Sequence, residues 1–333
     1  MSETYKKKDF VSDQEVKWCP GCGDYAILAA TQMAMAQLGI APHKTAVISG
    51  IGCSSRFPYY MNTYGMHTIH GRAPGFVTGL KLTNPELSVW MITGDGDGLS
   101  IGGNHLAHII RRNIDVNIIL FNNEIYGLTK GQYSPTSQVG LKTKSTPFGS
   151  LDRAFSPMSF AMGAGATFFA RTMDTDPKHM IEVMKAAHEH KGTSVIEVFQ
   201  NCVIFNDKVH DKYTNRKTRD DHTVRVEHGK PLIFGKEKDQ ALRLAGLSLE
   251  TMTLEENNET LKDEIHIHDE TDKTLAFLYS QMNEIIPMGV LLKTETDKTY
   301  DQAVHEQIAH VKSTSQKKSF KDLLYSGDTW EVK

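Results

Sequence analysis

Short apolar runs alternate with longer amphipathic segments through the first two thirds of the chain. Runs of about five apolar residues bounded by glycine or polar residues predict buried parallel strands, because such strands are covered on both faces. The predicted strands are Thr45–Ser49, Ser88–Thr93, Asp115–Phe121, Ala166–Ala170 and Ser194–Phe199. Apolar residues at helical spacing predict helices before and between these strands. The predicted helices are Tyr25–Leu38, Pro74–Leu82, Ile101–Arg112 and Lys178–His190. The alternation favours a doubly wound α/β fold with a mostly parallel sheet.

The pattern changes after Asn206, where charged and histidine-containing segments such as Lys208–His228 and Glu255–Lys273 begin. We therefore divide the chain into an N-terminal arm (1–15), a main domain (16–206) and a C-terminal extension (207–333). The extension is too apolar to be fully disordered, so we expect it to pack on the domain or on a partner subunit. Within it, His266 and His268 stand at strand spacing, and we interpret this pair as a solvated surface segment.

Composition limits the possible classes of protein. Apolar residues make up 39% of the 333 residues, which is enough for a sizeable buried core, and no apolar stretch is long enough to span a membrane. The net charge of -3 argues against a basic nucleic-acid binder. The first ten residues lack a continuous hydrophobic segment, so nothing targets export. We expect a cytoplasmic protein that binds neither nucleic acid nor membranes.

The chain contains four cysteines, and a single metal centre would account for all of them. They are Cys19, Cys22, Cys53 and Cys202. In a reducing compartment, cysteines are better explained as metal ligands than as disulfides. From spacing alone, a zinc site and an iron–sulfur cluster remain alternatives.

A second segment indicates phosphate and metal binding. Gly94, Asp95, Gly96 and Asp97 follow a predicted strand directly, at the sheet edge where α/β folds bind ligands. Glycines allow backbone amides to close around phosphate, and a divalent cation would reconcile the Asp95 carboxylate with that anion. Asn123 follows the next strand along the chain, so its amide oxygen reaches the same edge.

These motifs carry a resemblance to a known family. GDG followed after a helix and a strand by NN is the pattern of thiamine diphosphate enzymes. The longer segment GDGDGLSIGGNHLAHIIRRNIDVNIILFNNEIYGLTKGQYSPTS resembles the β subunits of 2-oxoacid:ferredoxin oxidoreductases. WCPGCGD, GIGCSSR, HGRAPGFVTGLK and the late Asn201-Cys202 resemble that family in order and spacing. The resemblance covers roughly residues 16 to 210 and implies the thiamine diphosphate-binding fold for the main domain.

The resemblance implies three groups bound to this chain. One 4Fe-4S cluster would be held by Cys19, Cys22, Cys53 and Cys202. Magnesium would be held by Asp95, Asn123 and the carbonyl of Ile125. Thiamine diphosphate would be contacted by Asp24, Ile51, Gly52, Cys53, Ser54, Gly94, Asp95, Gly96, Asp97, Asn123, Glu124, Ile125, Tyr126, Gly127 and Leu128. Alternative roles are a helix N-cap for Asp24 and a turn or cap for Asp97.

Arg56 and His70 are the candidates for contact with the substrate. By the resemblance, Arg56 occupies a position where family members place a cation that meets the substrate, and a guanidinium binds a carboxylate in bidentate fashion. This favours 2-oxoglutarate, whose second carboxylate needs such a group, over pyruvate. Alternatives are a salt bridge to the partner subunit for Arg56 and a structural role for His70. Arg72 and Lys144 are weaker candidates.

The resemblance implies a reaction and its partners. The reaction is reversible oxidative decarboxylation of 2-oxoglutarate with coenzyme A to succinyl-CoA and CO2, with electrons passing through the cluster to ferredoxin. The chain would act only with an α subunit that supplies the pyrimidine domain, in a heterotetramer of two α and two β subunits. Alternatives are the same chemistry on pyruvate or a branched-chain 2-oxoacid, a non-oxidative thiamine diphosphate decarboxylase or synthase, and a zinc-stabilised scaffold without activity.

Overall fold

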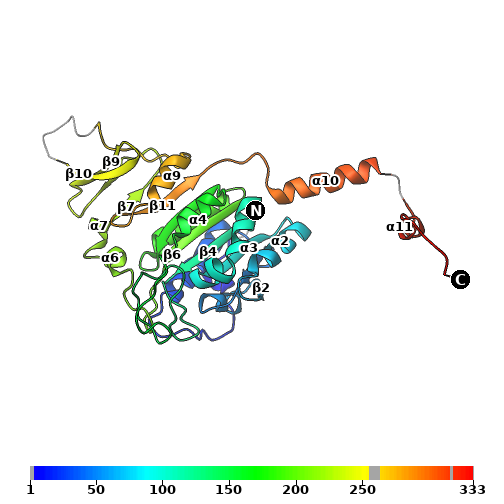
Figure 1. Ribbon diagram of the computed structural model, residues 1–333, viewed down its shortest axis with the longest axis horizontal. Coiled ribbons are helices and arrows are strands. Elements are labelled where there is room, and N and C mark those ends of the chain that lie inside the picture. The colour runs from blue at the N-terminus through cyan, green and yellow to red at the C-terminus, as the bar shows by residue number, and fades with distance from the viewer. Residues whose placement is uncertain (1–3, 255–262, 316–317, 333) are drawn as a thin grey trace.

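The computed structural model describes residues 4–254, 263–315 and 318–332. Its centre is an eight-stranded sheet with the order β2-β1-β3-β4-β6-β5-β11-β7 (Figure 1). These strands are β1 Thr45–Ser49, β2 Tyr64–His67, β3 Ser88–Gly94, β4 Val116–Asn122, β5 Phe168–Met173, β6 Thr193–Phe199, β7 Thr223–Val226 and β11 Ile286–Lys293. The six strands from β2 to β5 run parallel, whereas β11 is antiparallel to β5 and β7 is parallel to β11. The prediction of a mostly parallel sheet is confirmed.

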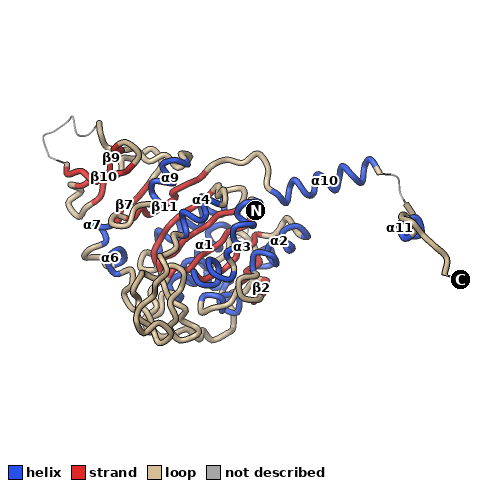
Figure 2. Tube along the Cα trace, in the orientation of Figure 1, coloured by secondary structure: helices blue, strands red, loops and turns tan. Residues whose placement is uncertain are grey.

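Helices cover both faces of this sheet (Figure 2). On one face, α1 (Asp24–Leu38) packs beside α5 (Pro177–Glu189), and their apolar residues join those of the strands in one core cluster. A second core cluster lies on the opposite face. Its helices are α2 Ala73–Thr83, α3 Gly103–Arg112, α4 Pro157–Gly163 and α9 Lys273–Tyr279. The doubly wound arrangement is therefore present as predicted.

Two boundaries differ from the sequence-based ranges for identifiable reasons. The strand predicted at Ala166–Ala170 begins at Phe168, because the end of α4 uses the preceding residues: the amide of Ala166 bonds to the carbonyl of Ala161, and Gly165 has a φ of +85°. The helix predicted from Ile101 begins at Gly103, because a π-helical turn, η4 (Asp97–Ile101), precedes it. Short 3-10 helices also occur, at η1 Lys7–Phe10, η2 Pro42–Lys44 and η3 Ser54–Tyr60.

Residues after Asn206 build three further features. Short helices α6 (Asp211–Thr214) and α7 (Arg219–His222) lead into β7. A separate antiparallel sheet has the order β10-β9-β8. Its strands are β8 Ile233–Phe234, β9 Gln240–Ala245 and β10 Ser248–Thr253. Finally, α10 (Tyr300–Thr314) and α11 (Phe320–Leu324) extend away from the body, as Figure 1 shows.

The histidine pair of the extension differs from its prediction. His268 is buried, with Nδ1 2.9 Å from the hydroxyl of Tyr279 and Nε2 2.9 Å from the carbonyl of Val290. The interpretation of this residue as solvated is wrong, because the segment forms β-bridges to Pro231, just before β8, and to Arg243 in β9 instead of lying on the surface. Part of Glu255–Lys273 lies outside the described residues.

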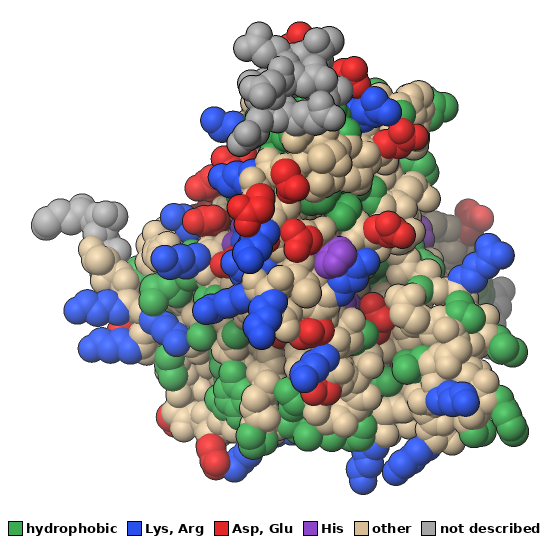
Figure 3. Space-filling view, turned by 90° about the vertical axis from the view of Figure 1, so that its left-hand side faces the viewer, with side chains coloured by type: hydrophobic (Ala, Val, Ile, Leu, Met, Phe, Trp, Pro, Cys, Tyr) green, Lys and Arg blue, Asp and Glu red, His purple; other side chains and the backbone are tan. Residues whose placement is uncertain are grey.

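The surface carries charges of both signs. On the face drawn in Figure 3, acidic and basic side chains are interspersed, and apolar side chains gather over the lower part of the view. None of the helices in the described ranges combines the length and the apolar character needed to cross a lipid bilayer.

Candidate active site

A cavity of about 110 Å³ lies at the carboxyl ends of β1, β3 and β4. β3 and β4 pair in parallel up to Gly94 opposite Phe121, so the segments that follow them are neighbours. The cavity is lined by Ile51, Gly52, Cys53, Ser54, His70, Gly94, Asp95, Gly96, Asp97, Phe121, Asn123, Ile125, Tyr126, Gly127, Leu128 and Thr129. The structure thus brings together every residue predicted to contact the cofactor except Asp24 and Glu124.

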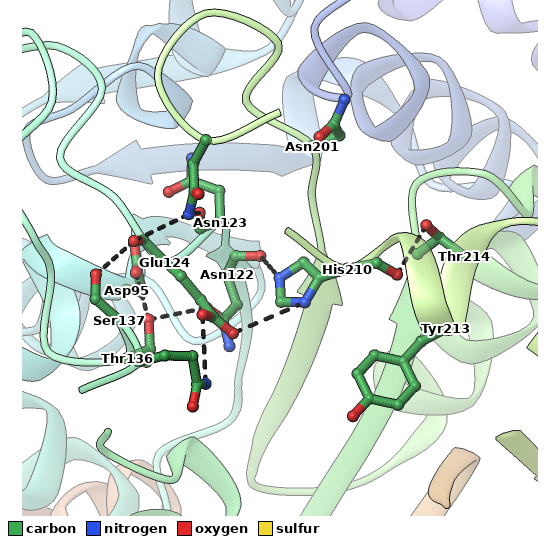
Figure 4. Close-up of polar contacts among 12 residues, drawn as sticks. Asp95, Asn122, Asn123, Glu124, Thr136, Ser137, Asn201, His210, Tyr213 and Thr214 are labelled. Carbon is green, nitrogen blue, oxygen red and sulfur yellow. Dashed lines mark hydrogen bonds and ion pairs between the residues drawn. The ribbon is translucent and has the colours of Figure 1, made fainter. Parts of the chain in front are cut away.

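Asp95 is buried at this cavity and is held by hydroxyl groups from a distant loop. Its Oδ2 accepts a hydrogen bond from Ser134 Oγ at 2.5 Å. It also accepts one from Thr136 Oγ1 at 2.6 Å (Figure 4). Burial raises the pKa of the Asp95 carboxyl, and these donors act in the opposite direction. A buried carboxylate of this kind is stabilised by a bound cation.

The Asp97 side chain forms hydrogen bonds within the protein. Its Oδ1 accepts from the backbone amides of Ile51 at 3.0 Å and Gly71 at 2.7 Å, and Oδ2 accepts from Thr93 Oγ1 at 2.7 Å. A Cβ on Gly50 would lie 1.9 Å from Oδ2, so only glycine fits where the turn after β1 passes this carboxylate. The Asp97 side chain therefore organises the cavity wall, and only its backbone remains for phosphate.

The loop after β4 presents two side chains in different directions. Asn123 Oδ1 accepts from the amide of Ile125 at 3.2 Å, so the amide oxygen and the Ile125 carbonyl belong to the same tight turn. Glu124 has a φ of +55°, and its side chain points away from the cofactor cavity into a separate cavity that also contains Gln138 and His210 (Figure 4). Burial raises the pKa of Glu124 to about 7.

All four cysteines line a second cavity of about 290 Å³. Cys53, Asn123, Gly127 and Leu128 line both this cavity and the first one, so the two cavities share a wall. A Cβ on Gly127 would lie 3.5 Å from Cys202 Sγ and 3.6 Å from Cys53 Sγ, which places both sulfurs against the shared wall. Among the described residues, no three His, Cys, Asp or Glu side chains form a group that could hold a metal ion.

Burial and neighbouring negative charges disfavour the ionised thiolate form of the cysteines in this cavity. Burial, Asp24 and the other cysteines raise the pKa of the Cys22 thiol, and the same causes raise the pKa of Cys53 to about 12. Thiolate ligands form readily only when positive charge is added. A cationic group is therefore the occupant that this set of side chains suits.

Asp24 lies in the cysteine cavity and has an unsatisfied oxygen. Gly23, not Asp24, is the N-cap of α1, and no side chain caps this helix, so the N-cap interpretation of Asp24 is wrong. Its Oδ2 is buried without a hydrogen-bond partner in the described part of the chain. Burial and the nearby Asp174 raise the pKa of Asp24 to about 7.

The cationic candidates fall in different places. Arg56 lines the cysteine cavity and donates from Nε to the hydroxyl of Tyr60 at 3.0 Å; no carboxylate lies within ion-pair distance of it among the described residues. Arg72 instead contacts the ring of His105 on α3. Lys144 is exposed on a loop and lines neither cavity.

Sequence reasoning missed Ser134, Thr136 and Gln200. Gln200 follows β6 directly and contacts both Asn123 and Cys22. Its position at the carboxyl end of a central parallel strand is a usable signal, since that edge binds ligands in α/β folds. Ser134 and Thr136 lie in an irregular loop and leave no comparable signal.

Comparison with known proteins agrees with this geometry. Residues 50–198 match the family model described as thiamine pyrophosphate enzyme, C-terminal TPP binding domain. The chain is 47% identical to the 2-oxoglutarate oxidoreductase subunit KorB of Mycobacterium tuberculosis, over 98% of this chain and 88% of that protein. It is 52% identical to the β subunit of 2-oxoacid:ferredoxin oxidoreductase 1 of Aeropyrum pernix, over 57% of this chain and 60% of that subunit.

A solved structure resembles almost the whole chain. It is the 2-oxoglutarate:ferredoxin oxidoreductase from Magnetococcus marinus with 2-oxoglutarate, coenzyme A and succinyl-CoA bound. The TM-score is 0.77 at 34% identity, and the match covers 97% of this chain and 96% of that chain. The chain therefore belongs to the 2-oxoacid:ferredoxin oxidoreductase family, as a β subunit of the 2-oxoglutarate type.

Proposed function

We propose that this subunit, together with an α subunit, catalyses oxidative decarboxylation of 2-oxoglutarate with coenzyme A to succinyl-CoA and CO2. Two electrons leave through one 4Fe-4S cluster to ferredoxin, and the reaction is reversible. The observation that carries the proposal is the shared wall of the two cavities, built by Cys53, Asn123, Gly127 and Leu128. Electron transfer from a thiamine site to a cluster requires such closeness.

The cofactor cavity suits thiamine diphosphate with magnesium. When bound, the thiamine group supplies an electron sink for decarboxylation of a 2-oxoacid. Gly52 and Gly94 expose bare backbone there: a Cβ on Gly52 would meet nothing within 4 Å, and one on Gly94 would meet only Ser54 Oγ, at 3.5 Å. Asp95, Asn123 Oδ1 and the Ile125 carbonyl offer the oxygen ligands that magnesium prefers.

The cysteine cavity suits a cluster better than a zinc ion. Zinc–sulfur bonds of about 2.3 Å bring the sulfurs of a tetrahedral site to within about 4 Å of one another. The described side chains do not converge on one ion in this way, although all four cysteines line one cavity. A four-iron cube fills a larger space, and its thiolate ligands support one-electron chemistry. Asp24, whose Oδ2 is buried without a hydrogen-bond partner among the described residues, also lines this cavity.

Arg56 is the residue that we assign to the second carboxylate of 2-oxoglutarate. Its guanidinium carries no ion pair in the described part of the chain and lines the cavity beside the cofactor wall. His70, which lines the cofactor cavity, is the second candidate for substrate contact. The relatives named for 2-oxoglutarate support this choice of substrate over pyruvate.

We assign residues 16–206 as the cofactor-binding domain, since residues 50–198 match the C-terminal TPP binding domain of thiamine pyrophosphate enzymes. Thiamine diphosphate enzymes also require a pyrimidine domain, which we assign to an α subunit. We infer a heterotetramer of two α and two β subunits in the cytoplasm. Residues 207–333 would pack on the domain or on the α subunit.

Anaerobic co-purification with the α subunit tests the proposal. About four irons and four acid-labile sulfides for each β chain are expected. Dye reduction should require both coenzyme A and a 2-oxoacid, with 2-oxoglutarate used best. Zinc without sulfide would reject the cluster and leave the scaffold alternative. CO2 release that is independent of coenzyme A and of the dye would instead indicate a non-oxidative decarboxylase, and faster turnover of pyruvate would reject the substrate.

A further inference from the structure

One buried side chain touches both candidate centres. Gln200 is 1% exposed and follows β6 directly. Its Oε1 accepts a hydrogen bond from Asn123 Nδ2 at 2.6 Å. Its Nε2 donates to Cys22 Sγ at 3.3 Å and to the carbonyl of Asn201 at 2.7 Å. Gln200 therefore links a proposed magnesium ligand to a proposed cluster ligand.

The orientation of the Gln200 amide is fixed by its partners. The Asn201 carbonyl can only accept, so the atom beside it must be the nitrogen of Gln200. Oε1 then faces Asn123 and requires a donor, which must be the Asn123 NH2 group. Consequently Asn123 Oδ1 points the other way, into the turn where it accepts the Ile125 amide. The backbone amide of Gln200 bonds to the carbonyl of Asn122 at 2.9 Å and holds the residue in place.

The same orientation aims an N–H group at the Cys22 sulfur. A hydrogen bond donated to a ligand sulfur stabilises negative charge on it, and such bonds help to set the reduction potential of iron–sulfur clusters. The reduced cluster carries one more negative charge than the oxidised cluster. The donation from Gln200 therefore favours the reduced form and raises the potential.

We propose that Gln200 is a positioning residue that serves both centres: it turns the oxygen of Asn123 towards magnesium and tunes the cluster through Cys22. The proposal rests on the function proposed above. It assigns two separable roles to two atoms of one amide, Oε1 for the magnesium side and Nε2 for the cluster side.

Two variants separate these roles in the complete α and β assembly. Gln200→Glu keeps an oxygen for the Asn123 NH2 group but cannot donate to Cys22, so it should lower the cluster potential with little change in magnesium-dependent thiamine diphosphate binding. Gln200→Leu loses both contacts, so it should lower the potential and also weaken cofactor binding about tenfold or more. Gln32→Leu is the matched control: Gln32 is buried and donates to the carbonyl of Tyr60, away from both cavities.

The readouts are a redox titration followed by electron paramagnetic resonance and a thiamine diphosphate titration at fixed magnesium followed by intrinsic fluorescence. Iron and sulfide content with circular dichroism identifies any variant that does not fold, in which case the Glu variant decides. An unchanged potential in both variants, or unchanged cofactor affinity in Gln200→Leu, overturns the inference while leaving the proposed function intact. Absence of iron and sulfide from the unmodified assembly overturns both.

Discussion

His70 Nδ1 lies 2.5 Å from Oδ1 of Asp97, and the same oxygen accepts hydrogen bonds from the backbone amides of Ile51 and Gly71. One buried group thereby joins the turns that follow β1 and β2 to the start of η4. Because Nδ1 is engaged, Nε2 is the ring nitrogen of His70 that remains available at the cofactor cavity. The Asp97 side chain thus fixes both the shape of the cavity and the orientation of the imidazole.

Asp97→Asn should destabilise the protein and weaken cofactor binding together. The amide keeps the size of the carboxylate but removes a charged acceptor from buried donors, which should cost about 2 kcal/mol in the free energy of unfolding. Urea unfolding and thiamine diphosphate titration measure the two effects. Asp13→Asn on the exposed N-terminal arm serves as the control. An Asp97→Asn protein as stable as the unmodified one would contradict the role given to this carboxylate.

Gly96→Ala should abolish thiamine diphosphate binding for steric reasons. Gly96 has a φ of -66°, so alanine is allowed by the backbone, but its Cβ would lie 2.1 Å from Cε1 of Tyr126. Tyr126 must then move, and with it the loop that lines the cavity and the bond from its hydroxyl to the Gly96 carbonyl. Fluorescence titration with magnesium measures binding. Gly103→Ala is the control, because a Cβ there meets nothing within 4 Å; equal affinities in the two variants would exclude this explanation.

Arg56→Ala should raise the KM for 2-oxoglutarate about tenfold or more and change the KM for pyruvate much less. The reason is the loss of a charge-assisted contact to the second carboxylate, which pyruvate lacks. Steady-state dye reduction with both substrates provides the comparison. Arg153→Ala removes an exposed loop arginine and should leave both constants unchanged. Equal effects of Arg56→Ala on the two substrates would exclude the carboxylate role.

Acid should remove the stabilisation that the buried neutral His210 contributes to the fold. Burial lowers the pKa of His210 to about 4, and the ring stacks on Phe199 while Nε2 contacts the Asn122 carbonyl. In the unfolded chain His210 is protonated near pH 6.5, whereas in the folded chain it is protonated only near pH 4. The stabilisation from this site is therefore complete above pH 6.5 and is lost as the pH falls towards 4. The loss is about 3 kcal/mol.

Urea unfolding between pH 7 and pH 4 tests this sign. His210→Gln should remove this contribution, so the unmodified protein should lose more stability on acidification than the variant, since glutamine does not titrate there. The surface variant His43→Gln should follow the unmodified protein. A His210→Gln protein with the same pH dependence of unfolding as the unmodified protein would show that His210 is not the buried group responsible.

The sequence predicted the sheet and most of the residues that line the candidate cofactor cavity because both leave local signals. β1, β4, β5 and β6 are buried at every position, and each contains a short run of apolar residues that marks it in the sequence. Asp95 follows the end of β3 and Asn123 the end of β4, both of which carry apolar runs. β2 is exposed at all four positions and lacks that signal, and β11 joins the sheet through contacts with β5 that are more than a hundred residues apart in sequence.

The residues that the sequence did not reveal act through distant contacts. Ser134 and Thr136 reach Asp95 across some forty residues, and Gln200 reaches Cys22 across 178. Similarly, the oxygen of Asp174 that accepts the Asn201 amide occupies the space where a side chain on Gly23 would lie, a relation that only the folded chain creates. Residue spacing in the sequence predicts one strand and the turn that follows it, whereas these contacts depend on the order of separate strands in the sheet.

The buried ion pair of Arg171 and Glu197 supports the loop after β4, which carries the proposed magnesium ligand Asn123. Arg171 Nε lies 2.7 Å from Glu197 Oε2, and Glu197 Oε1 accepts from Asn122 Nδ2 at 2.8 Å, one residue before Asn123. Removing one partner leaves a buried charge, so Glu197→Leu or Arg171→Met should each lower the free energy of unfolding by about 3–5 kcal/mol. The double variant should lose less than the sum, because neither charge remains.

A double-mutant cycle by urea unfolding measures this coupling. The exposed pair Lys298 and Glu306 gives the control, and Glu306→Gln should change stability by less than about 1 kcal/mol. Because Glu197 also holds Asn122, Glu197→Leu should weaken magnesium-dependent cofactor binding more than Arg171→Met does. Additive losses in the cycle would show that the pair acts as two independent polar groups, and the link from β5 and β6 to the loop after β4 would then have to come from backbone pairing alone.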